Sequence, residues 1–315
     1  MAKVYDVIIL GAGPAGLTAA IYACRRELKT LVISKDTGGQ ITKAHSMENF
    51  PGFEKIMGAE LAQKMAAQAE KLGAEIIFEE VTSIDKKGKN FAVKTTKNYE
   101  GKALIVAYGK TPRNIGVPGE EKYSGKGVSY CATCDMPIFK NKTIAIVGGG
   151  DSALDAALYG ANIAKKVYII HRRDEFRAAE IATKAAKKVK TIEFVLSSIP
   201  KEIKGDKFVK SIVVENVNTR ETKEIPVDGI FVEIGYEVKT EMVSHLVKLD
   251  NYKQIIIDNL CATSQPGIFA AGDITNTPIK QAVVAAGEGA KAALTAYNWL
   301  HQVKTTITTD WGNKK

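Results

Sequence analysis

Near the start of the chain, an apolar run leads into closely spaced glycines and then into a segment of helical spacing. Residues 4–10 have the composition of a buried strand, Gly11, Gly13 and Gly16 follow, and residues 15–26 continue with helical periodicity. Here the first glycine permits a tight turn, the second lets the backbone approach a pyrophosphate, and the third lets the helix pack on the strand. The helix start would also face an anion with free N–H groups. The stretch predicts an ADP-containing cofactor, with an ordinary glycine-rich turn as the alternative.

A second copy of this pattern occurs in the middle of the chain. Residues 143–147 are predicted to form a strand, Gly148, Gly150 and Ala153 form the turn, and residues 151–162 suit a helix. Two copies indicate two bound nucleotides. The chain is therefore predicted to be an α/β protein with two Rossmann-like dinucleotide-binding domains, the second inserted into the first.

The next strand of the first unit should end in an acidic residue that holds the ribose hydroxyls of the cofactor. The strand predicted at 29–34 departs from this rule, because Ser34 stands at its end and Asp36 follows two positions later. We expect Ser34 and Asp36 to share the ribose contact.

The corresponding strand of the second unit, at 166–170, is followed by a basic cluster. His171, Arg172, Arg173 and Arg177 lie where a strand end meets the adenosine ribose. An acidic residue there would suit NAD, whereas arginines suit the 2′-phosphate of NADP. The cluster predicts NADPH as the second nucleotide, with a solvated basic loop as the alternative.

Two features near the C-terminal end point back to the first cofactor. An apolar strand predicted within 267–273 ends in Gly-Asp, which could aim Asp273 at a cofactor hydroxyl. A helix of small residues is predicted over 280–300, and its start at Gln281 and Ala282 could offer N–H groups to a negatively charged ring. A reduced flavin carries such a charge. A simple turn is the alternative for the Gly-Asp pair.

Cys131 and Cys134 are separated by two residues and followed at once by Asp135. A zinc site needs about four ligands, and only Cys24, Cys261 and four scattered histidines remain for it. A structural disulfide is unusual in a reducing compartment. A redox pair fits better, because CxxC geometry lowers the pKa of one thiol and the thiolate attacks disulfides. Asp135 could then pass protons to and from the leaving thiolate, or cap a helix.

Composition narrows the remaining classes of function. The length of 315 residues suggests about two domains, and the net charge is +9, but the lysines are scattered and no nucleic-acid motif accompanies them. Residues 4–23 are long enough to span a membrane, yet Asp6 and the glycines argue against it, and no basic signal-peptide region precedes them. We expect a cytoplasmic protein that binds neither nucleic acid nor membrane. The polar tail at 304–315 is expected to be partly disordered.

Together these residues resemble the low-molecular-weight thioredoxin reductases, a group of flavoprotein oxidoreductases. The resemblance extends to about the end of the last predicted helix. Its motifs occur in family order: "GGQ" at 38–40, "ENFPG" at 48–52, "CATCD" at 131–135, "HRRDEFRA" at 171–178 and "AAGD" at 270–273.

The resemblance implies an FAD domain built from residues 1–115 and 243–315. An NADPH domain of residues 116–242 is inserted between these two segments and carries the cysteine pair. Larger glutathione-reductase-like relatives add a C-terminal dimerisation domain, for which this chain has no room. The implied assembly is therefore a homodimer formed through the FAD domains.

The same resemblance assigns roles to residues around the flavin. It places Gln40 and Asn49 beside the ring system, Asp273 on the ribityl chain, and Gln281 with Ala282 near the pyrimidine end. Each of these residues could instead stabilise a loop.

For the reaction, the resemblance implies hydride transfer from NADPH to FAD and opening of the disulfide through Cys134. Cys131 then attacks the disulfide of thioredoxin. Because nicotinamide and the cysteine pair cannot both occupy the reactive face of the flavin, it also implies rotation of the inserted domain about hinges near residues 115 and 243. Gly116 and Gly119 are compatible with the first hinge.

Three positions depart from the family pattern. Ser34 was described above, Tyr108 stands where threonine is usual, and Met136 stands where glycine is common. Met136 could shield the disulfide, change access to the flavin or alter the surface that meets the partner. Cys24 and Cys261 are expected to be packed as small apolar residues.

Two rival functions use the same residues. The chain could reduce another small dithiol protein, such as a glutaredoxin-like or peroxiredoxin-coupled carrier. It could also be a nucleotide-binding redox sensor with little turnover. Turnover with a disulfide protein distinguishes a reductase from a sensor.

Overall fold

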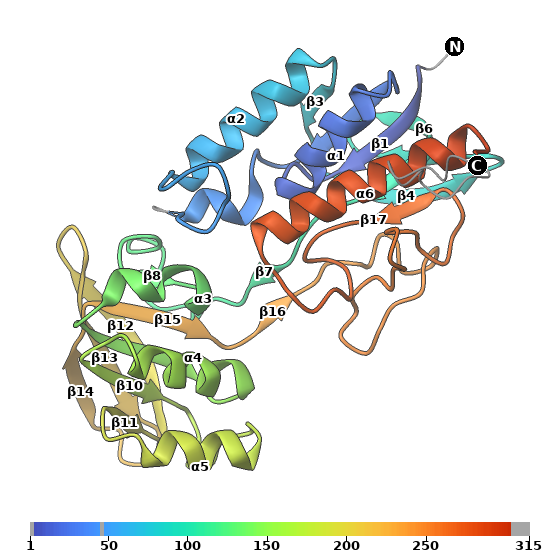
Figure 1. Cartoon of the computed structure of the whole chain (residues 1–315). Helices are drawn as coiled ribbons and strands as arrows, with labels where there is room; N and C mark the ends of the chain where they lie inside the picture. Colours follow the sequence, from blue (N-terminus) through green and yellow to red (C-terminus); the bar gives the residue numbers. More distant parts are fainter. Residues whose placement is uncertain (1–2, 45–46, 304–315) are drawn as a thin grey trace, which may run out of the picture. The chain divides into compact units, whose positions relative to one another are not determined.

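The computed structural model describes residues 3–44 and 47–303, which form two compact units. Unit 1 consists of residues 3–44, 48–111 and 238–303. Unit 2 consists of residues 112–237 together with Met47. The chain thus leaves unit 1, builds unit 2 and returns (Figure 1). The two crossings lie a few residues before the positions predicted from the sequence. Strands β7 (Thr111–Pro112) and β16 (Tyr236–Glu237) pair with each other at these crossings.

Unit 1 is built on a mixed sheet whose order is β3-β2-β1-β6-β5-β4. The central strand β1 (Val4–Leu10) pairs in parallel with β2 (Thr30–Ser34) and with β6 (Asn98–Val106). The first half of β6 pairs with β5 in antiparallel fashion, and its last residues pair in parallel with β17. The other strands are β3 (Glu75–Phe78), β4 (Ser83–Lys87), β5 (Asn90–Lys94) and β17 (Ile268–Ala270).

Small residues let the helices of unit 1 pack closely. Helices α1 (Pro14–Cys24) and α6 (Ala282–Leu300) lie side by side (Figure 1). A Cβ atom at Gly289 of α6 would collide with the carbonyl oxygen of Ala15 in α1, so this approach requires glycine. The unit also contains α2 (Gly58–Lys71) and the short 3₁₀ helix η1 (Gly39–Lys43).

Alternating residues of β1 face opposite sides of the sheet, as strand geometry requires. Ile8 and Leu10 belong to a buried cluster that includes Phe91 and Val243. Ile9 points to the opposite side of the sheet and contacts α1. A Cβ atom placed on Gly16 of this helix would lie 3.4 Å from the Cγ2 atom of Ile9. Both faces of the strand are therefore covered, which explains its unbroken apolar sequence.

Unit 2 has three layers around a parallel sheet of order β11-β10-β9-β15-β8. Ile144 and Ile146 of β9 pack in a cluster with helix residues, whereas Ala145 and Val147 pack in a cluster with the antiparallel strands β12, β13 and β14. The parallel strands are β8 (Val128–Ser129), β9 (Thr143–Gly148), β10 (Lys166–Ile170), β11 (Ile192–Val195) and β15 (Gly229–Glu233). The antiparallel strands are β12 (Ser198–Gly205), β13 (Val209–Asn216) and β14 (Thr222–Pro226). The helices are α3 (Ala132–Asp135), η2 (Met136–Phe139), α4 (Asp151–Ala161) and α5 (Glu180–Lys188).

Each unit places a helix directly after the strand at which the order of its parallel strands reverses, β1 in unit 1 and β9 in unit 2. Ligands of open α/β sheets bind at the carboxyl ends of the strands beside this point. The predicted α/β class and the two Rossmann-like sheets are confirmed. The last predicted helix begins at Ala282, two residues later than expected. No helix within the described residues has the length and apolar character needed to cross a membrane. The predicted tail at 304–315 lies outside the described residues.

Candidate functional site

The first glycine turn leaves a stretch of backbone open beside the start of α1. Gly11 has a positive φ of 112°, and a Cβ atom there would collide with the carbonyl oxygen of Ala107. A Cβ atom at Gly16 would collide with the carbonyl oxygen of Gly11. Gly13 is different: it is the N-cap of α1, and the nearest atom to its added Cβ would be 3.9 Å away. The three glycines therefore permit a tight turn, helix packing and approach of a ligand to the backbone.

Ser34 and Asp36 both hold loops next to this turn. The Oγ atom of Ser34 accepts a hydrogen bond of 3.1 Å from the backbone N–H of Ala12. The exposed Asp36 accepts one of 3.1 Å through Oδ1 from the N–H of Gly39. Ser34 thus ties the end of β2 to the glycine turn, and its own hydroxyl hydrogen could still reach a ribose. The predicted ribose contact stays a prediction for both residues.

Asp273 lies after β17 with two lysines around it. The Nζ atom of Lys110 is 3.9 Å from the Oδ2 atom of Asp273, and Lys280 donates to the backbone carbonyls of Asp273 and Thr275. Burial raises the pKa of the Asp273 carboxyl, while Lys110 and Lys280 oppose that shift. Burial lowers the pKa of Lys280. Sequence analysis assigned no role to either lysine, although Lys280 begins the last predicted helix and Lys110 lies two positions after Tyr108.

Two of the other predicted flavin residues meet at the start of α6, and a third is bonded to the backbone of Lys110. Asn49 donates a hydrogen bond of 3.1 Å from Nδ2 to the Oε1 atom of Gln281, and Gln40 donates to the carbonyl of Lys110. Gln281 is the extended N-cap of α6, and Ala282 is its first helical residue. The first N–H groups of a helix have no partner within it. Residues distant in sequence are therefore assembled beside free N–H groups.

Tyr108, whose backbone lies next to the first glycine turn, carries a buried hydroxyl without a hydrogen-bond partner among the described residues. The Cα atom of Tyr108 is 3.2 Å from the position of a Cβ atom on Gly11. The Tyr108 hydroxyl is buried, has no hydrogen-bond partner among the described residues, and has its pKa raised by burial. Together with the open backbone at Gly13, this orphaned group is compatible with a dinucleotide at this turn, as FAD would require.

The second glycine turn repeats the first in its essential geometry. A Cβ atom at Gly148 would collide with the carbonyl oxygen of Glu233 in β15. Gly150 is the N-cap of α4, and no described atom lies within 4 Å of an added Cβ there. Ala153 is fully buried under the turn. The open position again coincides with the start of a helix of 11 residues, which favours a phosphate group.

The arginine loop is attached directly to this second turn. The backbone N–H of Arg177 donates to the carbonyl oxygen of Gly149 at 2.9 Å. The imidazole of His171 occupies the space that a Gly149 side chain would need, and it stacks on Phe176 with ring centroids 5.3 Å apart. Its Nε2 atom donates to the carbonyl of Glu175 at 3.1 Å. Burial lowers the pKa of His171, and the neighbouring arginines add to this effect.

His171 was predicted as a nucleotide ligand together with the arginines. The structure gives it a different environment, because its ring is buried between the glycine turn and Phe176. Arg172, Arg173 and Arg177 are exposed on the loop. His171 thus holds the loop against the turn, and the three guanidinium groups are the ones available to an anion.

The cysteine pair lies just after β8 and forms a disulfide. Cys131 and Cys134 have Cα atoms 5.3 Å apart, and Cys131 is the N-cap of the short helix α3. Both residues are partly exposed. This pairing removes the two thiolates that a zinc site would use, and no group of three or more potential metal ligands occurs within residues 3–44 and 47–303.

A serine joins the cysteine segment to Asp135. The Oγ atom of Ser129 donates to the Oδ2 atom of Asp135 at 2.6 Å and accepts from the backbone N–H of Cys131 at 3.1 Å. Ser129 is 6% exposed. Burial raises the pKa of the Asp135 carboxyl, and the hydrogen bond from Ser129 opposes that shift. Sequence analysis assigned no role to Ser129, because a serine two positions before a cysteine carries no distinctive signal.

Met136, directly after Asp135, is buried in the core of unit 2. Its side chain is 0% exposed and belongs to the buried cluster of unit 2. The Sδ and Cε atoms lie 3.2 Å from the position of a Cβ atom on Gly160 in α4. The idea that the Met136 side chain forms part of a partner surface is therefore wrong, whereas its effects on the disulfide and on access to the flavin stay predictions. Met136 anchors η2 to α4 instead.

Tyr130, immediately before Cys131, is connected by hydrogen bonds to the segments at which the chain enters and leaves unit 2. Its hydroxyl donates to the Oε1 atom of Glu120 at 2.9 Å, and the buried Glu120 accepts from the N–H groups of Ile115 and Gly116 at 2.9 and 2.7 Å. The hydroxyl of Tyr236, in β16, donates to the carbonyl oxygen of Tyr130. The cysteine segment is thereby fixed to the first and last residues of the inserted unit.

The two remaining cysteines are free thiols. Cys261 is buried, and burial raises its pKa to about 12. Cys24 is partly buried, and burial raises its pKa as well. A raised pKa keeps a thiol protonated and unreactive. Both residues fit the predicted packing role.

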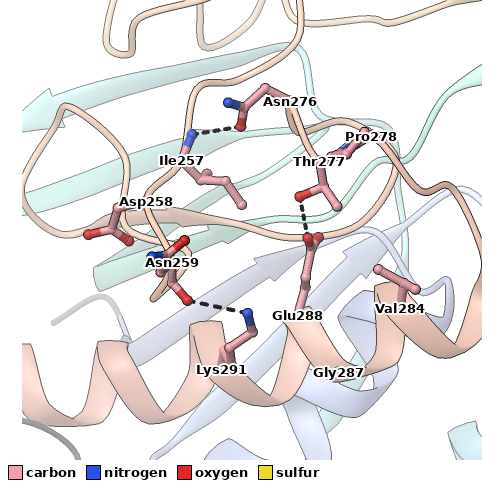
Figure 2. A pocket seen from close by; sticks show the side chains of 10 residues that line it. All are labelled: Ile257, Asp258, Asn259, Asn276, Thr277, Pro278, Val284, Gly287, Glu288 and Lys291. Atoms are coloured by element: carbon pink, nitrogen blue, oxygen red, sulfur yellow. Dashed lines mark hydrogen bonds between the residues drawn. The ribbon is translucent and has the colours of Figure 1, made fainter.

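Unit 1 also contains a pocket of about 500 Å³ beside α6 (Figure 2). Thr277 donates to Glu288, Lys291 donates to the carbonyl of Asn259 at 3.2 Å, and Asn276 accepts from the backbone of Ile257 at 3.1 Å. These polar groups are engaged with one another, so they stabilise the loop before α6.

Comparison with known proteins gives a consistent result over nearly the whole chain. Residues 5–289 match the family described as pyridine nucleotide-disulphide oxidoreductase. A thioredoxin reductase from Peptoclostridium acidaminophilum is 42% identical over 309 residues, covering 95% of this chain and 98% of the relative.

Solved structures agree with this match. Thioredoxin reductase from Streptococcus pyogenes superposes with a TM-score of 0.93 at 40% identity, covering 96% of this chain and 100% of the relative. Thioredoxin reductase from Lactococcus lactis in its FR conformation gives a TM-score of 0.64 at 43% identity, with coverage of 95% and 100%.

Proposed function

Because the chain belongs to the pyridine nucleotide-disulphide oxidoreductase family, we propose that it reduces the disulfide of thioredoxin with electrons from NADPH. The observation that carries the proposal is the disulfide between Cys131 and Cys134 with Asp135 directly after it. The proposal is supported by the glycine turn and the arginine loop of the same unit, whose geometry would suit NADPH.

Unit 1 is proposed to hold FAD at the first glycine turn. The backbone at Gly13 would face the pyrophosphate, and Ser34 with Asp36 would lie toward the ribose. Asp273, Gln40, Asn49, Gln281 and Ala282 would surround the ribityl chain and ring. When bound, FAD supplies the electron pair, received from NADPH, that reduces the protein disulfide.

Unit 2 is proposed to hold NADPH at the second glycine turn. Gly148, Gly150 and Ala153 leave room for the pyrophosphate at the start of α4. Arg172, Arg173 and Arg177 are exposed on the loop that the Arg177 N–H fixes to Gly149, so they can reach a 2′-phosphate.

The protein chemistry is a thiol–disulfide exchange. An electron pair and two protons convert the Cys131–Cys134 disulfide into two thiols. The Cys131 thiolate attacks one sulfur of the thioredoxin disulfide, which forms a mixed disulfide and releases the other thioredoxin sulfur as a thiolate. The Cys134 thiolate then attacks Cys131, which re-forms the protein disulfide and releases the second thioredoxin sulfur. The two protons leave with reduced thioredoxin.

Asp135 is proposed to move these protons. Burial raises its pKa, so the carboxyl holds a proton at higher pH than an exposed aspartate does. A protonated Asp135 can give that proton to a leaving thiolate and regain one from a cysteine thiol.

The inserted unit is proposed to move relative to unit 1 during the cycle, about β7 and β16. The two solved relatives support this idea. Both are about as similar to this chain in sequence, but their TM-scores are 0.93 and 0.64, as expected if the family uses more than one arrangement of its units.

The assembly is proposed to be a homodimer through unit 1, working in a reducing cytoplasm. A carrier other than thioredoxin, of the glutaredoxin-like or peroxiredoxin-coupled kind, would use the same residues.

The Cys134→Ser variant tests the function. We expect it to lose thioredoxin reduction while it still oxidises NADPH with an artificial electron acceptor. Cys24→Ser is the matched control and should keep both activities. Full thioredoxin reduction by Cys134→Ser would contradict the proposal, and an active enzyme that ignores thioredoxin but reduces another dithiol protein would replace the substrate.

A further inference from the structure

Ser129 connects the attacking cysteine to the carboxylate beside it. Its single hydroxyl group donates to the Oδ2 atom of Asp135 at 2.6 Å and accepts from the N–H of Cys131 at 3.1 Å. The second nearby acceptor, the carbonyl of Cys131, is farther away at 3.4 Å, so the Ser129 hydroxyl donates to the Asp135 carboxyl. Ser129 is 6% exposed, which leaves little water to compete for these bonds.

We propose that Ser129 is a positioning residue that holds the carboxyl group of Asp135 for proton transfer at the cysteine pair. The proposal rests on the proposed reductase function, in which Asp135 is the proton donor. One hydroxyl fixes the carboxyl to the backbone at Cys131, because both bonds meet at the same Oγ atom. When Asp135 gives its proton to a leaving thiolate, it becomes an anion, and the Ser129 hydrogen bond stabilises that anion.

Ser129 is itself well placed by the fold. It is the last residue of β8, which pairs in parallel with β15 through Ser129 and Phe231. Burial raises the pKa of Asp135 and the Ser129 hydrogen bond lowers it, so the two effects together determine the pH range in which Asp135 can give up its proton. Without the Ser129 hydroxyl, only the effect of burial remains, and the pKa of Asp135 rises further.

Two disulfides whose leaving thiolates differ in pKa can distinguish a role of Ser129 in proton delivery from a purely structural role. The thiolate that leaves an alkyl disulfide has a high pKa and needs a proton as it departs, whereas the thiolate that leaves an acidic aromatic disulfide needs none. A residue that serves proton delivery should therefore matter for the first substrate and not for the second. A residue that only shapes the helix after Cys131 should affect both substrates equally.

The experiment uses the full-length protein, reduced with dithiothreitol and freed of it, and mixed with 2-hydroxyethyl disulfide or with 5,5′-dithiobis(2-nitrobenzoate). We expect Ser129→Ala to slow the exchange with the alkyl disulfide by roughly tenfold or more, as for loss of part of a general-acid contribution. Its pH profile should shift to higher pH. The rate with the aromatic disulfide should stay within about twofold of wild type, since no proton is needed there. Ser129→Thr, which keeps the hydroxyl, should restore the alkyl reaction.

The double variant Ser129→Ala/Asp135→Asn separates the two assignments. If Ser129 acts through Asp135, the double variant is no slower than Asp135→Asn alone. Equal slowing with both disulfides, or multiplied effects in the double variant, would overturn the role of Ser129 only. A wild-type pH profile for Asp135→Asn would instead overturn the acid role of Asp135, and the Ser129 proposal with it.

Discussion

Replacing Met136 by alanine should weaken the part of unit 2 that supports the cysteine pair. The side chain is 0% exposed and belongs to the buried cluster of unit 2, where its Sδ and Cε atoms face Gly160, which has no side chain to fill the space that Met136 would leave. Buried Met→Ala changes cost about 2–5 kcal/mol, and a cavity that cannot collapse lies in the middle or upper part of that range. We therefore expect a loss of about 3 kcal/mol.

Hydrogen exchange of the amides in α4 measures this loss without interference from unit 1. At about 1.4 kcal/mol for each factor of ten, exchange across residues 151–161 should become roughly a hundredfold faster. Ile138→Ala is the matched control. Ile138 lies two positions further along but is 46% exposed, so its removal should change stability by about 0.5 kcal/mol or less.

A second substitution tests the contact itself. Gly160→Ala alone should destabilise α4, because the new Cβ atom would lie 3.0 Å from Ile144 and 3.2 Å from Met136. In the Met136→Ala background that methyl group enters the vacated space, so the pair should be more stable than the sum of the single changes by about 1 kcal/mol. Additive effects, or an exchange rate for Met136→Ala within about twofold of wild type, would refute the packing argument.

Two other predictions concern the arginine loop. Replacing Arg172, Arg173 and Arg177 by glutamine should raise the KM for NADPH by roughly tenfold or more and leave the KM for NADH nearly unchanged, because only NADPH carries the 2′-phosphate. Lys184→Gln on α5 is the control. Equal effects on both nucleotides would refute the assignment of these arginines to the 2′-phosphate. His171 has a pKa below its ordinary value of 6.5, so the folded state binds fewer protons than the unfolded state as the pH falls below that value. The stability that neutral His171 contributes is thus complete above pH 6.5 and lost as the pH falls below that value. His171→Phe should therefore flatten the dependence of Tm on pH below pH 6.5. An unchanged slope of Tm against pH would contradict the conclusion that burial of the neutral imidazole stabilises the fold.

The parts of the structure that follow local rules could be predicted from the sequence. Strand β1 has the predicted bounds, and both glycine turns lead directly into helices. These features depend on apolar periodicity and on backbone conformations that glycine permits, and both are visible within a few residues.

The missed features depend on contacts between distant segments or on the direction of a side chain. Lys110 meets Asp273 only because β6 and β17 pair, and Tyr236 reaches Tyr130 only when the inserted unit closes on itself. Met136 could be assigned to the surface or to the core with equal reason from its position beside the cysteines. Its burial in the cluster of unit 2 and its approach to Gly160 decide for the core.

An anaerobic absorbance titration of the purified protein with NADPH measures directly whether the cofactor and the cysteine pair exchange electrons. We expect uptake of about four electrons per subunit, two by the flavin and two by the Cys131–Cys134 disulfide, and uptake of about two in Cys134→Ser. Uptake of only about two electrons by the unmodified protein would show that the disulfide does not exchange electrons with the cofactor, and it would contradict the proposed reductase function.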